Sequence, residues 1–132
     1  MMKNRDEGFQ ANYVGVDIDP NSGIYIKKLL NKHFKLIISD SIEYISKTRT
    51  KFDLYINDSD HSIKYEGEEY TAIRRKMNSN SIVIGDNAHI SDQLCNFAIT
   101  HNYKYTYFSE KPKNHWYPGG GIGVVKILAL NE

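Results

Sequence analysis

Two apolar stretches of this 132-residue sequence each run into side chains that could do chemistry. The stretches cover residues 53–57 and 81–85, and short apolar runs of this kind are typical of β-strands. The polar side chains that follow them are Asp58, Asp60, His61, Asp86 and Asn87. If the two strands are parallel neighbours, their carboxyl ends meet at the edge of the sheet where ligands bind in open α/β folds. The sequence therefore predicts that Asp58, Asp86 and Asn87 place three oxygen ligands together.

Carboxylate and amide oxygens are the ligands of hard cations, so we expect this group to bind Mg²⁺ or Ca²⁺. The structural alternative is two solvated acids and a turn asparagine. His61 is the candidate general base, because an imidazole titrates near neutral pH. Asp60 and His89 are alternatives for the same role, and a loop histidine can also be exposed without any role.

Strands and helices are predicted to alternate along most of the chain. A polar lead-in, residues 1–12, precedes one α/β domain, residues 13–132. Apolar patterning predicts strands over 13–16, 34–39, 53–57, 81–85, 103–108 and 122–130. Helices are expected over 20–33, 42–47, 65–77 and 91–101.

This alternation predicts a mostly parallel sheet, because parallel strands need crossover connections that are usually helical. The last two strands have no helix between them, so we expect an antiparallel pair at one edge. The helix over 65–77 is expected to bury Tyr70, Ile73 and Met77, and residues 78–80 are expected to form a turn.

The composition limits the classes of partner. The sequence carries 17 basic and 16 acidic residues, which gives no reason to expect nucleic acid or an anionic membrane. The single cysteine, Cys95, excludes an internal disulfide and fits a reducing compartment. We expect a cytoplasmic protein, because the sequence has neither a long apolar run nor an apolar signal-like start.

The order of these elements resembles that of the class I S-adenosylmethionine-dependent methyltransferases, whose fold is Rossmann-like. Within that class the chain is most similar to the metal-dependent O-methyltransferases of the catechol, caffeoyl-coenzyme A and sugar types. The motifs that carry the resemblance are Val14-Gly15-Val16-Asp17, Ser39-Asp40-Ser41, Asn57-Asp58-Ser59-Asp60-His61-Ser62 and Gly85-Asp86-Asn87. Each motif is weak by itself, and the four in this order cover about residues 13–130.

The resemblance implies a cofactor site for S-adenosylmethionine near the first two strands. Asp17 would accept hydrogen bonds from the ribose hydroxyls, which suits a carboxylate. Asp40 would accept one from the adenine amino group, with Ser41 close by. The structural alternative is that these residues cap the helices that follow them.

The resemblance also assigns Asp58, Asp86 and Asn87 to the family's metal ligands. A cation there would orient the hydroxyl group of a small-molecule acceptor for attack on the sulfonium methyl group. His61 has a position similar to that of the proton-accepting histidine in the sugar O-methyltransferases.

The chain departs from the family in lacking the first strand and its glycine-rich turn. Residues 1–12 have no apolar run and only Gly8. Either the strands that end at Asp17 and Asp58 pair directly, or a second copy in a homo-oligomer or a complementing chain fills the position, or the chain is part of a longer protein.

Two other functions remain open from the sequence. A non-catalytic remnant or interaction module would keep the fold and lose the cofactor site. A phosphatase of the haloacid dehalogenase type would use Asp17-Ile18-Asp19 as its nucleophile motif, although the residues that follow this motif and the spacing of Asp92 fit that family poorly.

Overall fold

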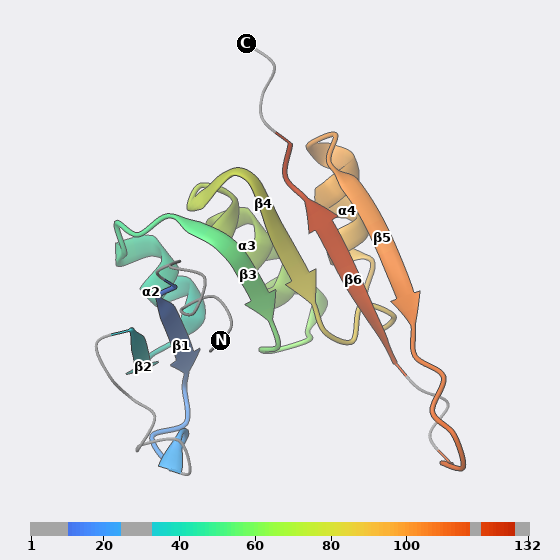
Figure 1. Ribbon diagram of the computed structural model, residues 1–132, viewed down its shortest axis with the longest axis horizontal. Coiled ribbons are helices and arrows are strands. Elements are labelled where there is room, and N and C mark those ends of the chain that lie inside the picture. Colours follow the sequence, from blue (N-terminus) through green and yellow to red (C-terminus); the bar gives the residue numbers. More distant parts are fainter. Residues whose placement is uncertain (1–10, 25–32, 117–119, 129–132) are drawn as a thin grey trace. The chain divides into compact units, whose positions relative to one another are not determined.

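The computed structural model describes residues 11–24, 33–116 and 120–128 (Figure 1). The chain divides into two compact units, residues 1–44 and 45–132, and each is described by itself. None of the helices in these described ranges has the length and apolarity needed to cross a lipid bilayer.

The first unit contains a pair of parallel strands, β1 (Tyr13–Asp17) and β2 (Phe34–Ile38). Their register pairs Tyr13 with Phe34 at one end and Asp17 with Ile38 at the other. Both strands therefore end at the same edge, as the sequence predicted. Helix α2 (Ser41–Lys47) follows β2 and begins within this unit. The helix expected over 20–33 falls largely on residues 25–32, which lie outside the described residues.

The second unit contains a four-stranded sheet in the order β3-β4-β6-β5. Its strands are β3 (Phe52–Asn57), β4 (Met77–Gly85), β5 (Lys104–Ser109) and β6 (Gly121–Lys126). Strands β3 and β4 are parallel, whereas β6 is antiparallel to both β4 and β5. The predicted α/β fold class, with parallel strands followed by an antiparallel C-terminal pair, is confirmed.

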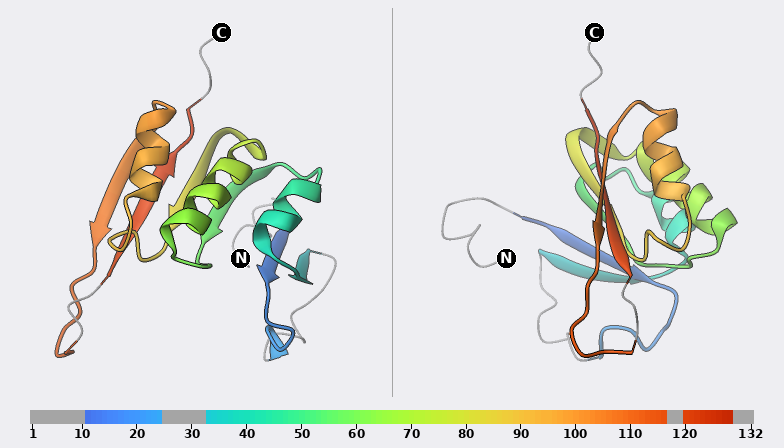
Figure 2. Two further views of the ribbon diagram at one scale, coloured as in Figure 1. Left: turned by 180° about the vertical axis from the view of Figure 1, so that it is seen from behind. Right: turned by 90° about the vertical axis from the view of Figure 1, so that its right-hand side faces the viewer.

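Two helices cover one face of this sheet: α3 (Ile63–Arg74) and α4 (Gln93–Thr100) (Figure 2). The core between helices and sheet contains Tyr70, Ile73, Val83, Leu94, Phe97 and Val125. Residues of β3 alternate, so Tyr55 faces this core while Leu54 and Ile56 are 50% and 60% exposed. The polar residue that ends the core-facing row of β3 is Asn57, and it is buried.

The boundary between α3 and β4 differs from the prediction. The helix ends at Arg74, and the Lys76 N–H donates to the Ile73 carbonyl at 2.8 Å. Met77 is buried as the first residue of β4 and not as part of the helix face. The expected turn over 78–80 lies inside β4, where the register with β3 shifts and Asn80 has a φ of 63°. A β-bulge explains why this polar segment resembles a turn in the sequence.

Strand β1 is hydrogen-bonded to β2, and β3 to β4. Among the described residues of each unit, β2 is the strand that pairs with β1, and β4 is the strand that pairs with β3. The direct pairing of β1 with β3 that the sequence left open stays a prediction.

Candidate functional site

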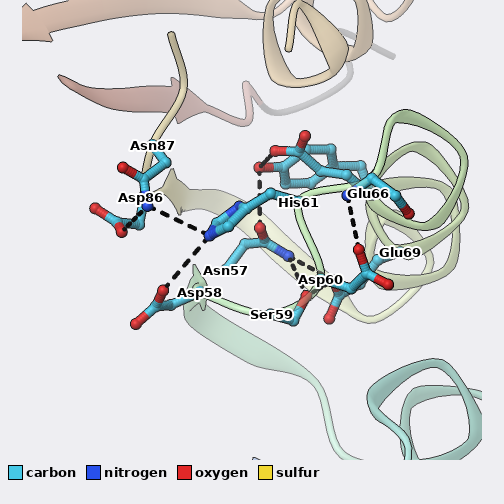
Figure 3. Close-up of polar contacts among 11 residues, drawn as sticks. Asn57, Asp58, Ser59, Asp60, His61, Glu66, Glu69, Asp86 and Asn87 are labelled. Atoms are coloured by element: carbon cyan, nitrogen blue, oxygen red, sulfur yellow. Dashed lines mark hydrogen bonds and ion pairs between the residues drawn. The ribbon is translucent and has the colours of Figure 1, made fainter. Parts of the chain in front are cut away.

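The parallel pairing of β3 and β4 brings the two strand ends together. Asn57 is in register with Gly85, and the Asp86 N–H donates to the Asn57 carbonyl at 2.9 Å. Asp58 and Asp86 are therefore the first residues beyond the paired ends. One ligand atom each of Asp58, His61 and Asp86 lies within 4.8 Å of the others (Figure 3). The predicted proximity of the two carboxylates is confirmed, and metal binding by them stays a prediction.

His61 and Asn87 complete this cluster. The His61 Nε2 atom lies 3.8 Å from Asp58 Oδ1 and 3.4 Å from Asn87 Nδ2. The Asn87 amide also donates to Asp86 Oδ2 at 2.8 Å. Since an amide can turn by 180° with little change in shape, Asn87 can present its nitrogen or its oxygen to the cluster. We refer to Asp58, His61, Asp86 and Asn87 as the acidic cluster.

The loop conformation explains the asparagine of the acidic cluster, and the two ring nitrogens of His61 have different surroundings. Asn87 has a φ of 48°, a left-handed conformation that asparagine tolerates better than most residues. The Nδ1 atom of His61 is buried and has no hydrogen-bond partner among the described residues. Its other ring nitrogen, Nε2, is the one that faces Asp58 and Asn87.

The two alternatives to His61 lie differently. Asp60 is exposed, and its Oδ1 accepts a hydrogen bond from the Ser62 N–H at 2.7 Å. This contact closes a turn directly before α3. Asp60 does not belong to the converging group of Asp58, His61 and Asp86, and His89 is exposed.

In the first unit, Asp17 ends β1 as an exposed carboxylate. Its Oδ1 accepts the Asp19 N–H at 2.9 Å, and its Oδ2 accepts the Ser22 hydroxyl. The hydrogen bond from Ser22, followed by that from Asp19, lowers the pKa of the Asp17 carboxyl below its ordinary value. Asp17 is therefore ionised at neutral pH, and each oxygen retains a lone pair that could accept a hydroxyl group.

Asp40 follows the end of β2 and caps α2. Its Oδ1 accepts the Glu43 N–H at 2.8 Å, which confirms the predicted N-cap. The Ser39 N–H donates to the Asp17 carbonyl at 2.9 Å, so the ends of β1 and β2 lie side by side. The carboxyl ends of β1 and β2 thus carry Asp17, Asp40 and Ser41. Their binding of ribose and adenine stays a prediction.

A buried polar network that was not predicted lies beneath the acidic cluster. Its centre is two glutamates of α3, Glu66 and Glu69, which are 3% and 1% exposed. Their spacing with Tyr70 and Ile73 places all four on one helix face, so the predicted burial of Tyr70 and Ile73 was the signal that could have found them.

A groove of about 800 Å³ runs beside α3, and Ile63, Gly67, Thr71 and Gln93 are among its lining residues. The groove shares no residue with the acidic cluster. It is therefore a separate surface feature of the second unit.

Comparison with known proteins identifies the type of domain. A family model described as "Methyltransferase domain" matches residues 1–88. No curated protein matches the sequence.

Solved structures share the fold at low sequence identity. The N-methyltransferase NodS from Bradyrhizobium japonicum WM9 has a TM-score of 0.70 at 8% identity, over 89% of this chain and 74% of that chain. A putative O-methyltransferase from Klebsiella pneumoniae has a TM-score of 0.70 at 12% identity, over 89% and 62% of the two chains. The putative methyltransferase SMU.1697c from Streptococcus mutans, in complex with SAH, has a TM-score of 0.64 at 12% identity, over 89% and 76%. The predicted Rossmann-like fold of the methyltransferases is confirmed, and a shared fold does not identify the methyl acceptor.

Proposed function

Since this chain belongs to the methyltransferase domain family, we propose that it transfers a methyl group from S-adenosylmethionine to a hydroxyl group of a small molecule, assisted by a divalent cation. The observation that carries this proposal is the acidic cluster, in which two carboxylates and an imidazole converge within 4.8 Å. The likeness to a structure solved with SAH supports the choice of cofactor.

We assign binding of S-adenosylmethionine to Asp17, Asp40 and Ser41. The ionised Asp17 carboxylate would accept the ribose hydroxyls, while its contacts to Asp19 and Ser22 hold its orientation. Asp40, whose Oδ1 also caps α2, would accept a hydrogen bond from the adenine amino group.

The chemistry of the acidic cluster fits a divalent cation. Two carboxylates supply the negative charge and the oxygen atoms that Mg²⁺ and Ca²⁺ prefer, and the Asn87 amide can add a third oxygen. Mn²⁺ prefers the same carboxylate and amide oxygens, which makes Mn²⁺ a useful probe. When bound, the cation would supply positive charge that favours the ionised form of an acceptor hydroxyl.

We assign to His61 the role of general base, which accepts the proton of the acceptor hydroxyl group. The acceptor oxygen would form a bond to the methyl carbon while the carbon–sulfur bond breaks and S-adenosylhomocysteine leaves. The hydroxyl proton would pass to Nε2 of His61. Asp58, whose carboxylate lies 3.8 Å from that nitrogen, would stabilise the resulting imidazolium. Asp60 is the second candidate for this role, although its Oδ1 is held by the Ser62 N–H.

A non-catalytic interaction module is the alternative. Within the described part of its own unit β3 pairs with a single strand, β4, and this favours the alternative. Pairing of the other edge of β3 with a second copy or a complementing chain stays a prediction. The family match favours methyl transfer over the phosphatase reading of Asp17-Ile18-Asp19.

Calorimetric titration with S-adenosylhomocysteine, with and without Mg²⁺ or Mn²⁺, tests the proposal. We expect binding of S-adenosylhomocysteine and of the cation, and release of S-adenosylhomocysteine from S-adenosylmethionine in the presence of small hydroxylated acceptors. If the chain binds neither ligand in any combination, the interaction module replaces the enzyme.

A further inference from the structure

We propose that Glu69 and Glu66 are positioning residues that hold the two loops of the acidic cluster in place. This inference rests on the proposed function of that cluster. Both glutamates project from α3 toward the ends of β3 and β4 (Figure 3). Their carboxylates are buried, and each makes hydrogen bonds to a loop that carries a member of the acidic cluster.

Glu69 holds the residues on both sides of Asp58. Its Oε2 accepts hydrogen bonds from the Asn57 amide and from the Ser59 hydroxyl. Its Oε1 accepts the Tyr55 hydroxyl at 2.6 Å. Because Asn57 and Ser59 flank Asp58 directly, Glu69 fixes the backbone from which the Asp58 carboxylate projects.

Glu66 makes the corresponding contact to the loop after β4. Its Oε2 accepts the hydroxyl of Ser91, and Ser91 lies in the loop that Asp86 and Asn87 begin. Its Oε1 accepts the Tyr70 hydroxyl at 3.0 Å. That hydroxyl also lies 3.5 Å from Asn57 Oδ1, so the contacts of Glu66 and Glu69 meet at the end of β3.

Gly85 makes this junction possible. It is the last residue of β4 and directly precedes Asp86. A Cβ atom at Gly85 would lie 2.5 Å from the Tyr70 hydroxyl. The absence of a side chain at this position lets Tyr70 reach both Glu66 and Asn57.

The chemistry of the network argues against a merely space-filling role. Within the described residues, the groups that donate to the two carboxylates are hydroxyls and one amide, all of them neutral. Burying a carboxylate among neutral groups is costly, and apolar side chains of similar volume fill a core at lower cost. A fully hydrogen-bonded polar network fixes the orientation of its members, which apolar packing does less well.

The two tyrosines are suited to remain donors. Burial raises the pKa of the Tyr55 phenol, and the charge of Glu69 raises it further. Burial and then the charge of Glu66 raise the pKa of the Tyr70 phenol in the same way. Both phenols therefore keep their protons at any pH at which the protein would act, and the contacts to the glutamates persist.

Backbone amides within the loops provide a test that needs no ligand. The Ser62 N–H donates to Asp60, the Asp86 N–H to Asn57, and the Ile90 N–H to Asn87. In the full chain without metal, we expect Glu69→Gln to speed hydrogen exchange of the Ser62 and Asp86 amides. Glu66→Gln should speed exchange of the Ile90 amide, and each increase should be about tenfold, as expected for the loss of one hydrogen bond to a charged group.

Glu68→Gln is the matched control, because Glu68 is an exposed glutamate of the same helix. It should leave exchange of these amides unchanged. Equal exchange in Glu69→Gln and Glu68→Gln would overturn the proposal. A rise spread evenly over the whole chain would also overturn it, because the glutamates would then support the core and not the loops.

Ser59 variants keep the test valid if a glutamate variant does not fold. Ser59→Ala removes the hydroxyl that reaches Glu69, whereas Ser59→Thr keeps it. We expect faster loop exchange in the alanine variant and near-normal exchange in the threonine variant. Equal exchange in both would count against the proposal.

The Mn²⁺ affinity of the same samples separates this inference from the proposed function. We expect Glu69→Gln and Ser59→Ala to weaken Mn²⁺ binding about tenfold, the usual cost of losing a residue that supports a metal ligand. Ser59→Thr should bind Mn²⁺ with near-normal affinity. All affinities are measured at a temperature at which the variants remain folded. If the unaltered chain does not bind Mn²⁺, the metal part of the proposed function fails, while the exchange data still decide whether the glutamates hold the loops.

Discussion

The imidazole Nε2 of His61 lies 3.8 Å from the carboxylate of Asp58, three residues earlier in the same loop. The Asp58 side chain is 72% exposed and that of His61 is 24% exposed. A contact of this kind with one partner in solvent contributes little to stability. The Asp86 carboxylate, from a different loop, joins the same group.

The two carboxylates should therefore control cation binding. We expect Asp58→Asn and Asp86→Asn each to weaken Mn²⁺ binding at least about tenfold, or 1.4 kcal/mol, because each removes a charged oxygen ligand. Electron paramagnetic resonance of free Mn²⁺ measures the affinity. Asp92→Asn is the control, since Asp92 is an exposed acid of the same unit whose side chain makes no cap hydrogen bond to α4. Equal affinities in all three variants would contradict the metal assignment.

Asp17 should control binding of the cofactor. We expect Asp17→Ala to weaken S-adenosylhomocysteine binding by about tenfold or more, because the ribose hydroxyls would lose a charged acceptor. Isothermal titration calorimetry measures this. Asp53→Asn serves as the control, because Asp53 is an exposed acid outside all assigned sites. An Asp17→Ala protein that binds as tightly as the control would remove Asp17 from the cofactor site.

The Ser22 hydroxyl should set the ionisation of Asp17. We expect Ser22→Ala to raise the pKa of the Asp17 carboxyl toward 3.8, because the hydrogen bond from Ser22 is the largest cause of its lowered pKa. A pH titration of the side-chain carboxyl carbon by nuclear magnetic resonance measures the change.

The sign of the accompanying stability change follows from linkage. A carboxyl whose pKa is lower in the folded state stabilises the fold at pH values above its unfolded pKa, and loses this contribution as the pH falls through the folded pKa. The stability difference between the unaltered chain and Ser22→Ala should thus be full at neutral pH and shrink at acidic pH. A difference that grows on acidification would contradict the role of Ser22.

Strands β1, β2 and β3 and the second half of β4 could be predicted, because each is a short apolar run that ends at or directly before a polar residue. The rule that parallel strands end at one edge was enough to bring Asp58 and Asp86 together before the structure was known. The start of β4 could not be predicted in this way. Residues 78–80 are of types common in turns. Their place in the sheet depends on a register shift against β3, which the local sequence pattern does not indicate.

The support of the site was beyond the sequence for a different reason. Glu68 and Glu69 are adjacent residues of the same type, yet one is exposed and the other is buried. The partners of Glu69 come from β3 and the loop after it. Ser91, the partner of Glu66, comes from the loop after β4. Helix periodicity can indicate which side of α3 faces the core, but it cannot indicate that buried carboxylates will find enough donors there.

Replacing glycine by alanine should change the free energy of unfolding in opposite directions at two positions of the second unit, Gly85 and Gly67. At Gly85 that atom would lie 2.9 Å from the Leu94 side chain and within 2.5 Å of the Tyr70 hydroxyl, both inside the core. We expect Gly85→Ala to lower the free energy of unfolding by about 1–3 kcal/mol, because a packed core cannot yield without strain.

At Gly67, in the middle of α3, a Cβ atom would meet the end of the Gln93 side chain at 2.6 Å. This side chain is flexible and can turn away. Gly67→Ala should therefore raise the free energy of unfolding by up to about 1 kcal/mol, since alanine loses less backbone entropy in a helix. Urea unfolding followed by circular dichroism measures both variants. If Gly85→Ala proves as stable as Gly67→Ala, Tyr70 is not held against the end of β4 as the structure has it.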